Sequence, residues 1–362
     1  MRRLIVVEAR GGDAVVDRLR RAWDDRDAVF PLDPRLPAPA RDRVLAAVRP
    51  EDGVDDGDAL VVATSGTTGE PKAAVLTHDA VAASARATSA RLAVDPATDR
   101  WLACLPLAHV GGLSVVTRAL VTGTPLTVHD RVVPAAVEAA ATAGCTLVSL
   151  VPAVLDRVDT AAFRAVVLGG SAMPADLPAN AVTTYGMTET GSGVVYDGRP
   201  LDGVEVRVVD GQVQVRGPML LRCYRDGRDP KDREGWFATG DAGAWDAEAS
   251  RLQVFGRAGD LIVTGGENVW PVAVERVLAG HPAVGEVAVV GRPDPRWGQR
   301  VVALVVPATA GAPPTLDELR EAVGRVLPAY AAPRELELVA ALPRTPTGKV
   351  ARHRLAPAPP TP

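Results

Sequence analysis

Short apolar runs alternate with alanine-rich stretches of helical pattern along the first part of this chain, up to about residue 200. A strand that is buried on both faces of a sheet reads as such an apolar run, because helices cover both of its sides. We therefore predict strands at Leu60–Val62, Thr146–Val151 and Ala165–Leu168, and helices at Asp79–Leu92 and Pro134–Ala143. This order predicts an α/β fold class in which helices cover largely parallel β-sheets.

The pattern becomes β-rich beyond that point. Val204–Val209 and Gln212–Arg216 alternate in polarity around Asp210-Gly211, which is a strong signal for a hairpin with a two-residue turn. Further short segments of this kind follow through Val254. We expect a β-rich subdomain that completes a large N-terminal domain over residues 1–259.

The last part of the chain has the pattern of a small α+β domain over residues 260–355. Pro271–Ala279 is typical of a helix, with proline in its first turn and Gly280 as the stop. A second helix, Thr315–Leu327, begins with a capping box. The predicted strands of this domain are Val287–Val290 and Val301–Val306. The glycine-bearing joint at residues 256–260 marks the domain boundary, and we expect the proline- and alanine-rich tail at 356–362 to be disordered.

Composition excludes several classes of protein. Lys and Arg number 40 against 44 Asp and Glu, and aromatic residues make up 4% of the chain, so the sequence does not favour nucleic-acid binding. Cys104, Cys145 and Cys223 are too far apart for a disulfide framework, which suits a reducing compartment. The most apolar stretch, Ala139 to Leu155, is interrupted by polar residues, glycine and proline and is too short for a membrane span. We therefore expect a cytoplasmic protein without stable membrane insertion.

A loop rich in glycine and hydroxyl groups, from Thr64 to Lys72, directly follows the apolar run at residues 59–63. Backbone N–H groups and hydroxyls in such a loop can surround phosphate oxygens, and Lys72 adds a positive charge. The spacing differs from that of a Walker A loop, and Pro71 precedes the lysine. An ordinary strand-to-helix turn is the alternative interpretation of this segment.

Four further groups of residues are ambiguous when each is taken alone. His109 lies in an apolar turn with glycines nearby, where a structural role is common. The segment from Thr184 to Glu189 places an aromatic ring, a hydroxyl and a carboxylate in a predicted loop, which could equally be a turn followed by a helix. Asp241 could accept hydrogen bonds from a ribose diol, or could serve only its own turn. Lys349, in a loop of proline and glycine, could be a solvated surface residue.

Taken together and in order, these motifs resemble those of the adenylate-forming superfamily, which contains acyl-CoA synthetases, adenylation domains and luciferases. The resemblance extends from about Leu60 to Leu355. It implies a reaction with ATP, Mg²⁺ and coenzyme A, in which a carboxylate forms an acyl-adenylate and a thiol then displaces AMP. The implied catalytic residues are Lys349, Glu189, Thr188 and His109, with Glu189 as the metal ligand. The implied ATP-binding residues are Thr64, Ser65, Gly66, Thr67, Thr68, Gly69, Lys72, Gly170, Thr184, Tyr185, Gly186, Asp241 and Arg257.

The same resemblance implies a mobile C-terminal domain that rotates between the two half-reactions. Asp260 matches the hinge position of the superfamily. After rotation Lys349 would leave the active site, and Gly265, Gly266 and Glu267 would bind coenzyme A. Glycines suit that place, because the thiol arm needs a close approach to the backbone.

The residues implied for the acyl pocket resemble those of the 2-succinylbenzoate–CoA ligases of menaquinone biosynthesis. That group has an arginine nine positions after the motif histidine and a serine that opens a Ser-Leu-Val-Pro stretch, which match Arg118 and Ser149. Only 64 residues precede Ser65, which is short for the superfamily. Arg118 could pair with the second carboxylate of that substrate, or could lie on a helix surface. The implied acyl-binding residues are His109, Arg118, Ser149, Gly169 and Gly186.

Other assignments stay open from the sequence alone. The alternatives are another aryl- or acyl-CoA ligase, or a stand-alone adenylation enzyme that loads a carrier protein. A non-catalytic nucleotide sensor is a further possibility, against which Lys349 and Glu189 argue. The expected partners are a small carboxylic acid, ATP and coenzyme A, and the expected assembly is a monomer or homodimer.

Overall fold

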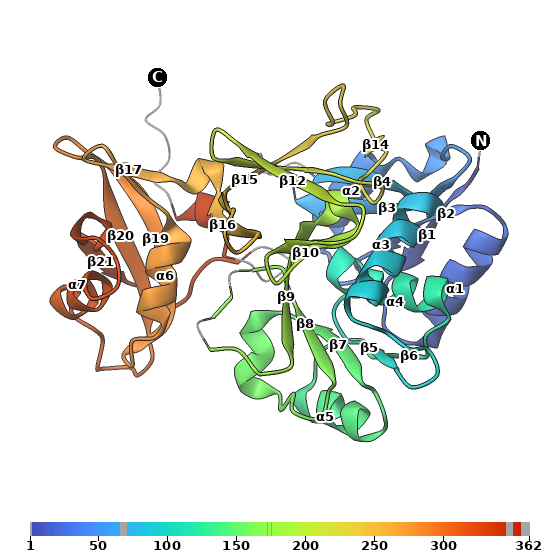
Figure 1. Ribbon diagram of the computed structural model, residues 1–362, viewed down its shortest axis with the longest axis horizontal. Helices are drawn as coiled ribbons and strands as arrows, with labels where there is room; N and C mark the ends of the chain where they lie inside the picture. The colour runs from blue at the N-terminus through green and yellow to red at the C-terminus, as the bar shows by residue number, and fades with distance from the viewer. Residues whose placement is uncertain (1, 66–70, 172, 175, 345–349, 356–362) are drawn as a thin grey trace. The chain divides into compact units, whose positions relative to one another are not determined.

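The computed structural model describes residues 2–65, 71–171, 173–174, 176–344 and 350–355 (Figure 1). The chain divides into two compact units. The first contains Met1–Arg207, Gln214–Ala238 and Asp246–Leu252, and the second contains Val208–Val213, Thr239–Trp245 and Gln253–Pro362. This division passes through the strands of the β-rich region, whereas the sequence places a boundary after residue 259; that boundary stays a prediction.

The first unit begins with a mixed five-stranded sheet in the order β1-β2-β3-β4-β14. The strands β1, β2 and β3 run parallel, and β3 and β4 form an antiparallel pair. Because the loop from Thr64 to Lys72 connects these two antiparallel strands, its alternative interpretation as a strand-to-helix turn is wrong. The strands are β1 (Leu4–Glu8), β2 (Ala28–Leu32), β3 (Asp58–Ser65), β4 (Pro71–Thr77) and β14 (Cys223–Tyr224).

A second, seven-stranded sheet has the order β11-β10-β9-β8-β7-β5-β6. The five strands from β6 to β9 in this order are parallel, and β10 and β11 are antiparallel additions at one edge. The largely parallel sheet expected from the sequence is therefore present. Its strands are β5 (Trp101–Ala103), β6 (Leu126–Val128), β7 (Leu147–Leu150), β8 (Ala165–Leu168), β9 (Ala181–Met187), β10 (Ser192–Tyr196) and β11 (Arg199–Pro200).

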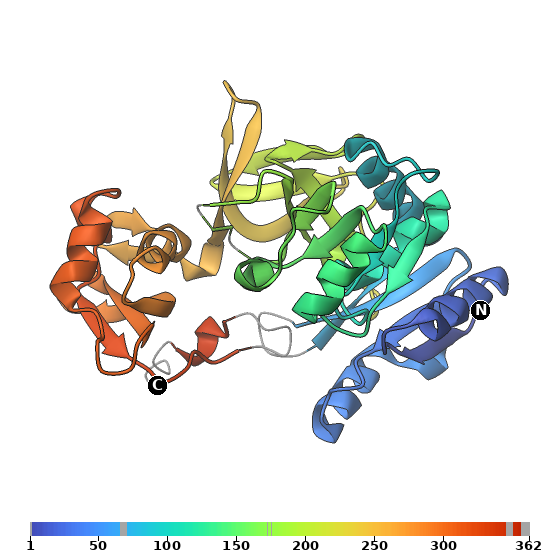
Figure 2. The same cartoon turned by 90° about the horizontal axis from the view of Figure 1, so that it is seen from below.

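Helices cover both sheets of this unit, and α1 packs against β1 and β2 while α3 packs against α4 (Figures 1 and 2). Side chains alternate along β3, so that Leu60 joins a core with Leu113 of α4 and Leu147 of β7, whereas Val61 joins a core with Val48 of α2. A third core packs α5 on the second sheet. Burial on both faces explains the continuous apolar runs of the sequence. The helices are α1 (Asp13–Asp24), α2 (Ala38–Val48), α3 (His78–Arg91), α4 (Val110–Thr122) and α5 (Pro134–Thr142), with the 3₁₀ turns η1 (Pro50–Asp52), η2 (Pro152–Arg157) and η3 (Thr188–Thr190).

The predicted hairpin is present in a third sheet, of order β12-β13-β15-β16. Asp210 and Gly211 both have positive φ, at 50° and 77°, as the tight turn of a two-residue hairpin requires. The strands are β12 (Glu205–Val209), β13 (Gln212–Arg216), β15 (Phe237–Asp246) and β16 (Arg251–Arg257), followed by η4 (Ala258–Asp260).

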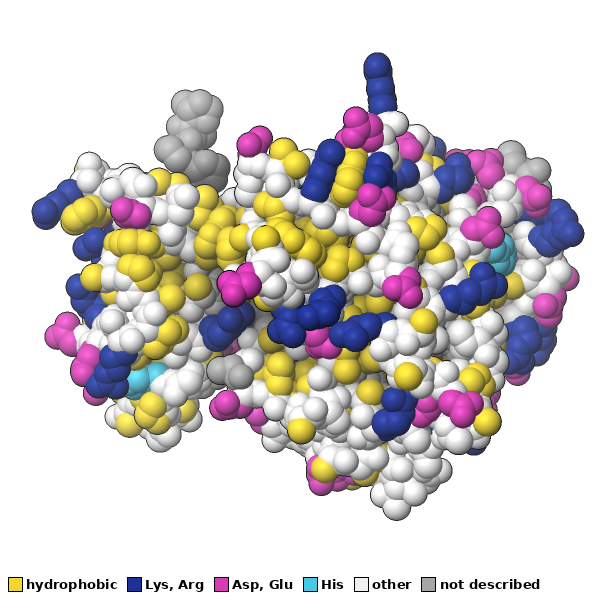
Figure 3. Space-filling model, viewed as in Figure 1, with side chains coloured by type: hydrophobic (Ala, Val, Ile, Leu, Met, Phe, Trp, Pro, Cys, Tyr) yellow, Lys and Arg dark blue, Asp and Glu magenta, His cyan; other side chains and the backbone are white. Residues whose placement is uncertain are grey.

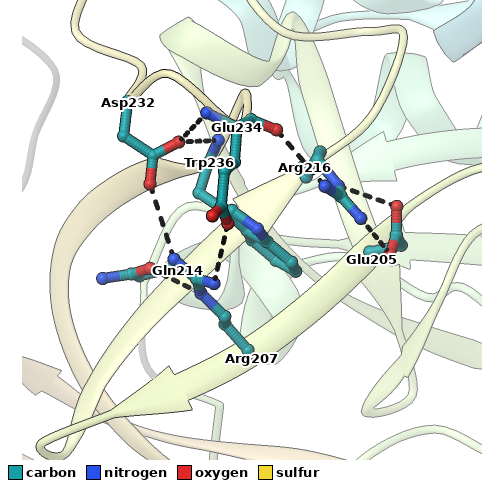
Figure 4. Close-up of polar contacts among 7 residues, drawn as sticks. All are labelled: Glu205, Arg207, Gln214, Arg216, Asp232, Glu234 and Trp236. Atoms are coloured by element: carbon teal, nitrogen blue, oxygen red, sulfur yellow. Dashed lines mark hydrogen bonds and ion pairs between the residues drawn. The ribbon is translucent and has the colours of Figure 1, made fainter.

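A cluster at the base of this hairpin fixes the turn that precedes β15 (Figure 4). The guanidinium carbons of Arg207 and Arg216 lie 4.2 and 4.6 Å from the ring centre of Trp236. Arg216 also donates two hydrogen bonds to Glu205, and Asp232 accepts one from the backbone N–H of Trp236 at 2.8 Å. The ring thus lies against the hairpin, with each charge near it paired.

The second unit contains a sheet in the order β18-β17-β20-β19, with β21 parallel to β20. The capping box predicted at Thr315 is confirmed, but α7 ends at Gly324 rather than at Leu327, because Pro328 lacks the N–H that would donate to the carbonyl oxygen of Gly324 in a longer helix. The α+β character of this part is confirmed, while its mobility stays a prediction, and the tail 356–362 lies outside the described residues. The elements are β17 (Ile262–Thr264), β18 (Glu267–Val269), α6 (Pro271–Ala279), β19 (Val284–Asp294), β20 (Gly298–Pro307), α7 (Leu316–Gly324), η5 (Ala329–Ala331), β21 (Glu335–Leu338) and η6 (Arg352–Arg354).

Candidate active site

Several predicted residues of the first unit gather at the carboxyl ends of the parallel strands. Ser149 lies on β7, Gly169 directly follows β8, and Thr184 to Gly186 lie in the second half of β9. His109 ends the turn after β5 and is the N-cap of α4. Because these strands run parallel, their carboxyl ends share one edge of the sheet, which is where ligands bind in open α/β sheets.

Glycines at this edge allow close approach of neighbouring strands. A Cβ atom at Gly169 would lie 2.6 Å from Oγ1 of Thr184, and one at Gly186 would lie 2.2 Å from the carbonyl oxygen of Ser192. Gly170 has a φ of +85°, which an L side chain rarely adopts. The sequence placed Thr184–Met187 in a loop, and this is wrong: these residues belong to β9, which pairs with both β8 and β10.

Arg118 is buried, with 2% of its surface exposed, so the alternative that it lies on a helix surface is wrong. Its Nη2 donates a hydrogen bond to Oγ of Ser192 at 3.3 Å, and its guanidinium carbon lies 4.7 Å from the ring centre of Trp101. Its Nε and Nη1 atoms have no hydrogen-bond partner among the residues that the structure describes. Burial lowers the pKa of the Arg118 guanidinium, and the nearby Tyr196 opposes that shift. A buried cation with two donor atoms that lack a described partner is suited to an anionic ligand.

A small cavity of about 10 Å³ adjoins Arg118, roughly the space that one water molecule needs. Apolar side chains of α3, α4, β3 and β4 supply most of its wall. Ser84, Ser114 and Thr117 supply hydroxyl groups. Of the residues expected at the acyl pocket, Arg118 lines this cavity, and Val110, which directly follows His109, lines it too.

The strands that carry the phosphate-loop motif are well placed for a tight connection. Thr64 lies opposite Lys72, and Ser65 lies opposite Pro71. Gly66, Thr67, Thr68 and Gly69 fall outside the described residues. The predicted contact of this loop with phosphate therefore stays a prediction.

Glu189 lies in η3 and accepts a hydrogen bond at Oε1 from the hydroxyl of Tyr224, at 2.9 Å. The Nζ atom of Lys72 lies 5.4 Å from the ring centre of Tyr224. Thr188 precedes Glu189 in η3, and Tyr185 lies on β9 opposite Val195. Tyr224 thus contacts both Lys72 and the predicted metal ligand Glu189.

The residues predicted at the ribose lie together in the second unit. Nε of Arg257 lies 3.1 Å from Oδ1 of Asp241, and Nη1 of Arg257 donates to the carbonyl of Thr239 at 2.9 Å. Gly240, between Thr239 and Asp241, has a φ of +73° and lets Arg257 approach closely. Thr239, Gly240 and Asp241 belong to β15 rather than to a turn between strands, and Arg257 is the last residue of β16.

The predicted hinge and coenzyme A residues also belong to the second unit. Asp260 ends η4, and its Oδ2 lies 3.7 Å from Nη1 of Arg352. Gly265 and Gly266 have φ values of +61° and +84° and form the turn before β18, in which Glu267 is exposed. Lys349 falls outside the described residues.

Sequence reasoning missed three side chains of the first unit: Tyr224, Trp101 and Ser192. Tyr224 and Trp101 belong to strands of two and three residues, which are too short for a periodic signal. Tyr224 contacts Glu189 across 35 positions of sequence, and Ser192 contacts Arg118 across 74. These contacts therefore arise from tertiary structure alone.

The surface charge, the apolar character of the helices and the grouping of possible metal ligands concern the partners that the chain could bind. Lys and Arg side chains lie interspersed with Asp and Glu side chains on the face shown in Figure 3. In the part of the chain that the structure describes, none of the helices has the length and apolar character that a membrane crossing needs. Nor do three or more His, Cys, Asp or Glu side chains of the described residues gather into a group that could hold a metal ion.

Comparisons with known proteins agree with this architecture. Residues 9–225 match the AMP-binding enzyme family, and residues 273–349 match the AMP-binding enzyme C-terminal domain. The chain is 43% identical over 338 residues to a protein of Mycobacterium tuberculosis (strain ATCC 25618 / H37Rv) named "Probable 2-succinylbenzoate--CoA ligase", with 86% of this chain and 87% of that protein covered. It is 33% identical over 337 residues to the 2-succinylbenzoate--CoA ligase of Enterococcus faecalis, with 82% and 68% covered.

A solved structure is similar over nearly the whole chain. It is the o-succinylbenzoate CoA synthetase (MenE) of Bacillus subtilis in complex with the acyl-adenylate intermediate OSB-AMP. The TM-score is 0.78 and the identity 26%, with 98% of this chain and 83% of that chain covered. These matches confirm the resemblance to adenylate-forming enzymes. The chain belongs to the family of AMP-binding enzymes, as an ATP-using, AMP-forming acyl-CoA ligase.

Proposed function

We propose that this enzyme is a 2-succinylbenzoate–CoA ligase of menaquinone biosynthesis, which makes 2-succinylbenzoyl-CoA, AMP and pyrophosphate. The relatives named above support the choice of acid. Within this chain, the buried Arg118 is the observation on which the proposed substrate rests. Coenzyme A is the proposed thiol substrate, and the proposed setting is the cytoplasm, as a monomer or homodimer.

Arg118 would recognise the second carboxylate of the substrate. An arginine whose Nε and Nη1 lack partners among the described residues is costly to bury, and a carboxylate would complete its hydrogen bonds. The pairing could be direct, or could run through a water molecule in the adjoining cavity. A fatty acid has no second carboxylate, so it would leave this buried charge unpaired.

In the first half-reaction a carboxylate oxygen of the acid would attack the α-phosphorus of ATP, and pyrophosphate would leave. Lys72 and the loop before it would hold the β- and γ-phosphates, and Thr188 would lie near the α-phosphate. Mg²⁺ binds proteins through one or two carboxylates together with substrate phosphates, and Glu189 offers one such carboxylate. When bound, the ion would neutralise charge that develops on the phosphates.

The remaining roles follow the motifs of the family. Tyr185 would flank the adenine, and Asp241 and Arg257 would hold the ribose. Lys349 would bridge the acyl carboxylate and the α-phosphate. In the second half-reaction the sulfur of coenzyme A would attack the acyl carbonyl carbon, and AMP would leave. For that step Gly265, Gly266 and Glu267 would face the reaction centre after the C-terminal domain rotates about Asp260.

A panel of carboxylic acids tests the proposal. The enzyme is supplied with ATP, Mg²⁺ and coenzyme A, and the formation of AMP and acyl-CoA is measured for 2-succinylbenzoate, benzoate and a medium-chain fatty acid. We expect kcat/KM to be highest for 2-succinylbenzoate. A tenfold or greater preference for another acid would overturn the proposed substrate, and turnover that needs a carrier protein in place of free coenzyme A would overturn the proposed thiol.

A further inference from the structure

Three side chains from separate segments of the first unit meet beside the proposed phosphate site. The hydroxyl of Tyr224 on β14 donates to Oε1 of Glu189 in η3, and the ammonium group of Lys72 on β4 lies 5.4 Å from the ring centre of the same tyrosine. Tyr224 therefore contacts both a proposed phosphate-binding cation and the proposed metal ligand. None of the motifs described above includes it.

The backbone fixes Tyr224 relative to both partners. The strand β14 is antiparallel to β4, with Tyr224 opposite Ala74 and only two positions from Lys72 in register. On the other side, the backbone N–H of Leu221 donates to the carbonyl oxygen of Glu189 at 2.7 Å. The short segment from Leu221 to Tyr224 thus connects the strand of the phosphate loop to the turn of the proposed metal ligand.

The chemistry of the hydroxyl suits a fixed donor. The phenol donates its hydroxyl proton to Oε1 of Glu189 at 2.9 Å, so it favours one orientation of that carboxylate. The ring face beneath Lys72 provides a cation–π contact, which favours one position of the ammonium group.

We propose that Tyr224 is a positioning residue that orients the carboxylate of Glu189, and with it Lys72, for a metal–nucleotide complex. The proposal rests on the proposed role of Glu189 as metal ligand. Partners that orient a metal ligand typically change metal affinity or activity about 10- to 100-fold when they are removed. A single carboxylate in a fixed direction also fits a metal ion that arrives bound to nucleotide phosphates.

Metal–nucleotide affinity is the direct test. Binding of Mn²⁺ together with a non-hydrolysable ATP analogue is measured by electron paramagnetic resonance for the wild type and for Tyr224→Phe, which keeps the ring. We expect the dissociation constant to rise about tenfold or more, whereas the affinity for the same analogue in EDTA stays unchanged. An unchanged affinity for the metal–nucleotide complex would overturn the proposal.

Two further variants separate positioning from general damage. Tyr196→Phe removes another buried hydroxyl of the same unit, one that lies 3.2 Å from Oγ1 of Thr88, and should leave metal–nucleotide affinity unchanged. If Tyr224 acts through Glu189, then Tyr224→Phe should have little further effect in a Glu189→Gln background. Additive losses, or an equal loss in Tyr196→Phe, would contradict the proposal. No acid is present in these experiments, so they succeed or fail independently of the identity of the acyl substrate.

Discussion

Arg118 lies inside the first unit with two nitrogen atoms for which no described residue provides an acceptor. Its contacts with Trp101 and Ser192 orient the guanidinium without neutralising its charge. Such a residue lowers stability in the absence of a ligand, and binding of an anion would offset that cost. The arrangement is typical of a residue that is kept for recognition rather than for folding.

Replacement of this arginine by methionine tests that interpretation. Because an apolar side chain of similar volume removes a buried, incompletely paired charge, we expect Arg118→Met to leave the free energy of unfolding unchanged or to raise it by about 1–4 kcal/mol. Urea denaturation measures it, with the m value as a check on compactness. A loss of about 3 kcal/mol, as for a broken buried ion pair, would mean that Arg118 is structural.

Asp99 provides the contrasting case of a buried charge that is fully paired within the chain. It accepts hydrogen bonds from Nε and Nη2 of Arg164 at 3.0 and 2.7 Å, and from Thr146 at 2.7 Å. Arg164→Ala should lower the free energy of unfolding by about 3 kcal/mol at neutral pH, because it leaves a buried carboxylate without its cation. Arg325→Ala, which removes an exposed pair with Glu321, should change it by about 0.5 kcal/mol or less. Equal effects of the two variants would contradict this account.

The contribution of Asp99 should depend on pH. Burial alone would raise the pKa of Asp99, but the hydrogen bonds from Arg164 and Thr146 outweigh it and hold the pKa below its usual value. A carboxyl with a depressed pKa in the folded state stabilises the protein above its unfolded pKa of about 3.9 and loses that effect as pH falls through the folded value. The difference in unfolding free energy between wild type and Asp99→Asn should therefore shrink below about pH 4. A difference that stays constant down to pH 2 would contradict the assignment.

The start of α4 determines where both His109 and Arg118 lie. Gly112 packs against the turn before the helix, where a Cβ atom would lie 2.3 Å from the carbonyl oxygen of Leu105. At the neighbouring Gly111, the nearest atom to such a Cβ would be a flexible leucine methyl group at 3.6 Å. The two glycines differ in packing but share the same helical turn.

Alanine at these two positions should therefore have different effects. Gly112→Ala should lower the free energy of unfolding by about 1–3 kcal/mol, since the backbone must shift to admit the methyl group. Gly111→Ala should leave it unchanged or raise it slightly, because alanine is the better helix former. Thermal or urea unfolding of both variants checks this, and a loss confined to Gly111→Ala would show that the packing is misassigned.

Elements specified by local patterns were predictable from the sequence. The hairpin around Asp210-Gly211 and the capping box at Thr315 depend on residues that lie close together in the chain. In contrast, the burial of Arg118 and the contact of Tyr224 with Glu189 depend on segments that lie far apart in the sequence, so no local pattern predicts them. The motifs of the site could therefore be identified from the sequence, whereas the side chains that contact them in the folded chain could not.

At the scale of the whole molecule, the proposed domain rotation would give the C-terminal domain one arrangement for each half-reaction. In the second unit, the proposed hinge residue Asp260 pairs with Arg352, three positions after Lys349. The base of the segment that carries Lys349 is defined by pairing of Arg344 with Val350. The proposed hinge residue thus forms an ion pair with a residue that lies close in sequence to the proposed catalytic lysine.

Variants of these two residues should separate the half-reactions. Lys349→Ala should slow adenylation by about 10²–10³-fold, the typical cost of one transition-state donor, while thioester formation from supplied acyl-adenylate stays nearly intact. Asp260→Pro should impair thioester formation more than adenylation because it stiffens the hinge, and Asp260→Asn controls for loss of the ion pair with Arg352. Single-turnover assays of each half-reaction measure both effects. Equal losses in the two steps would contradict domain rotation.

Arg118 is the residue proposed to bind the second carboxylate of the acid. The most direct measurement compares kcat/KM of wild type and Arg118→Met for 2-succinylbenzoate and for benzoate, which lacks the succinyl carboxylate. Loss of one partner of a buried charge pair costs about 2–5 kcal/mol, so the preference for 2-succinylbenzoate over benzoate should fall about 30-fold or more. If the two acids lost activity by the same factor, Arg118 would not recognise that carboxylate, and the proposed substrate would lose its support in this structure.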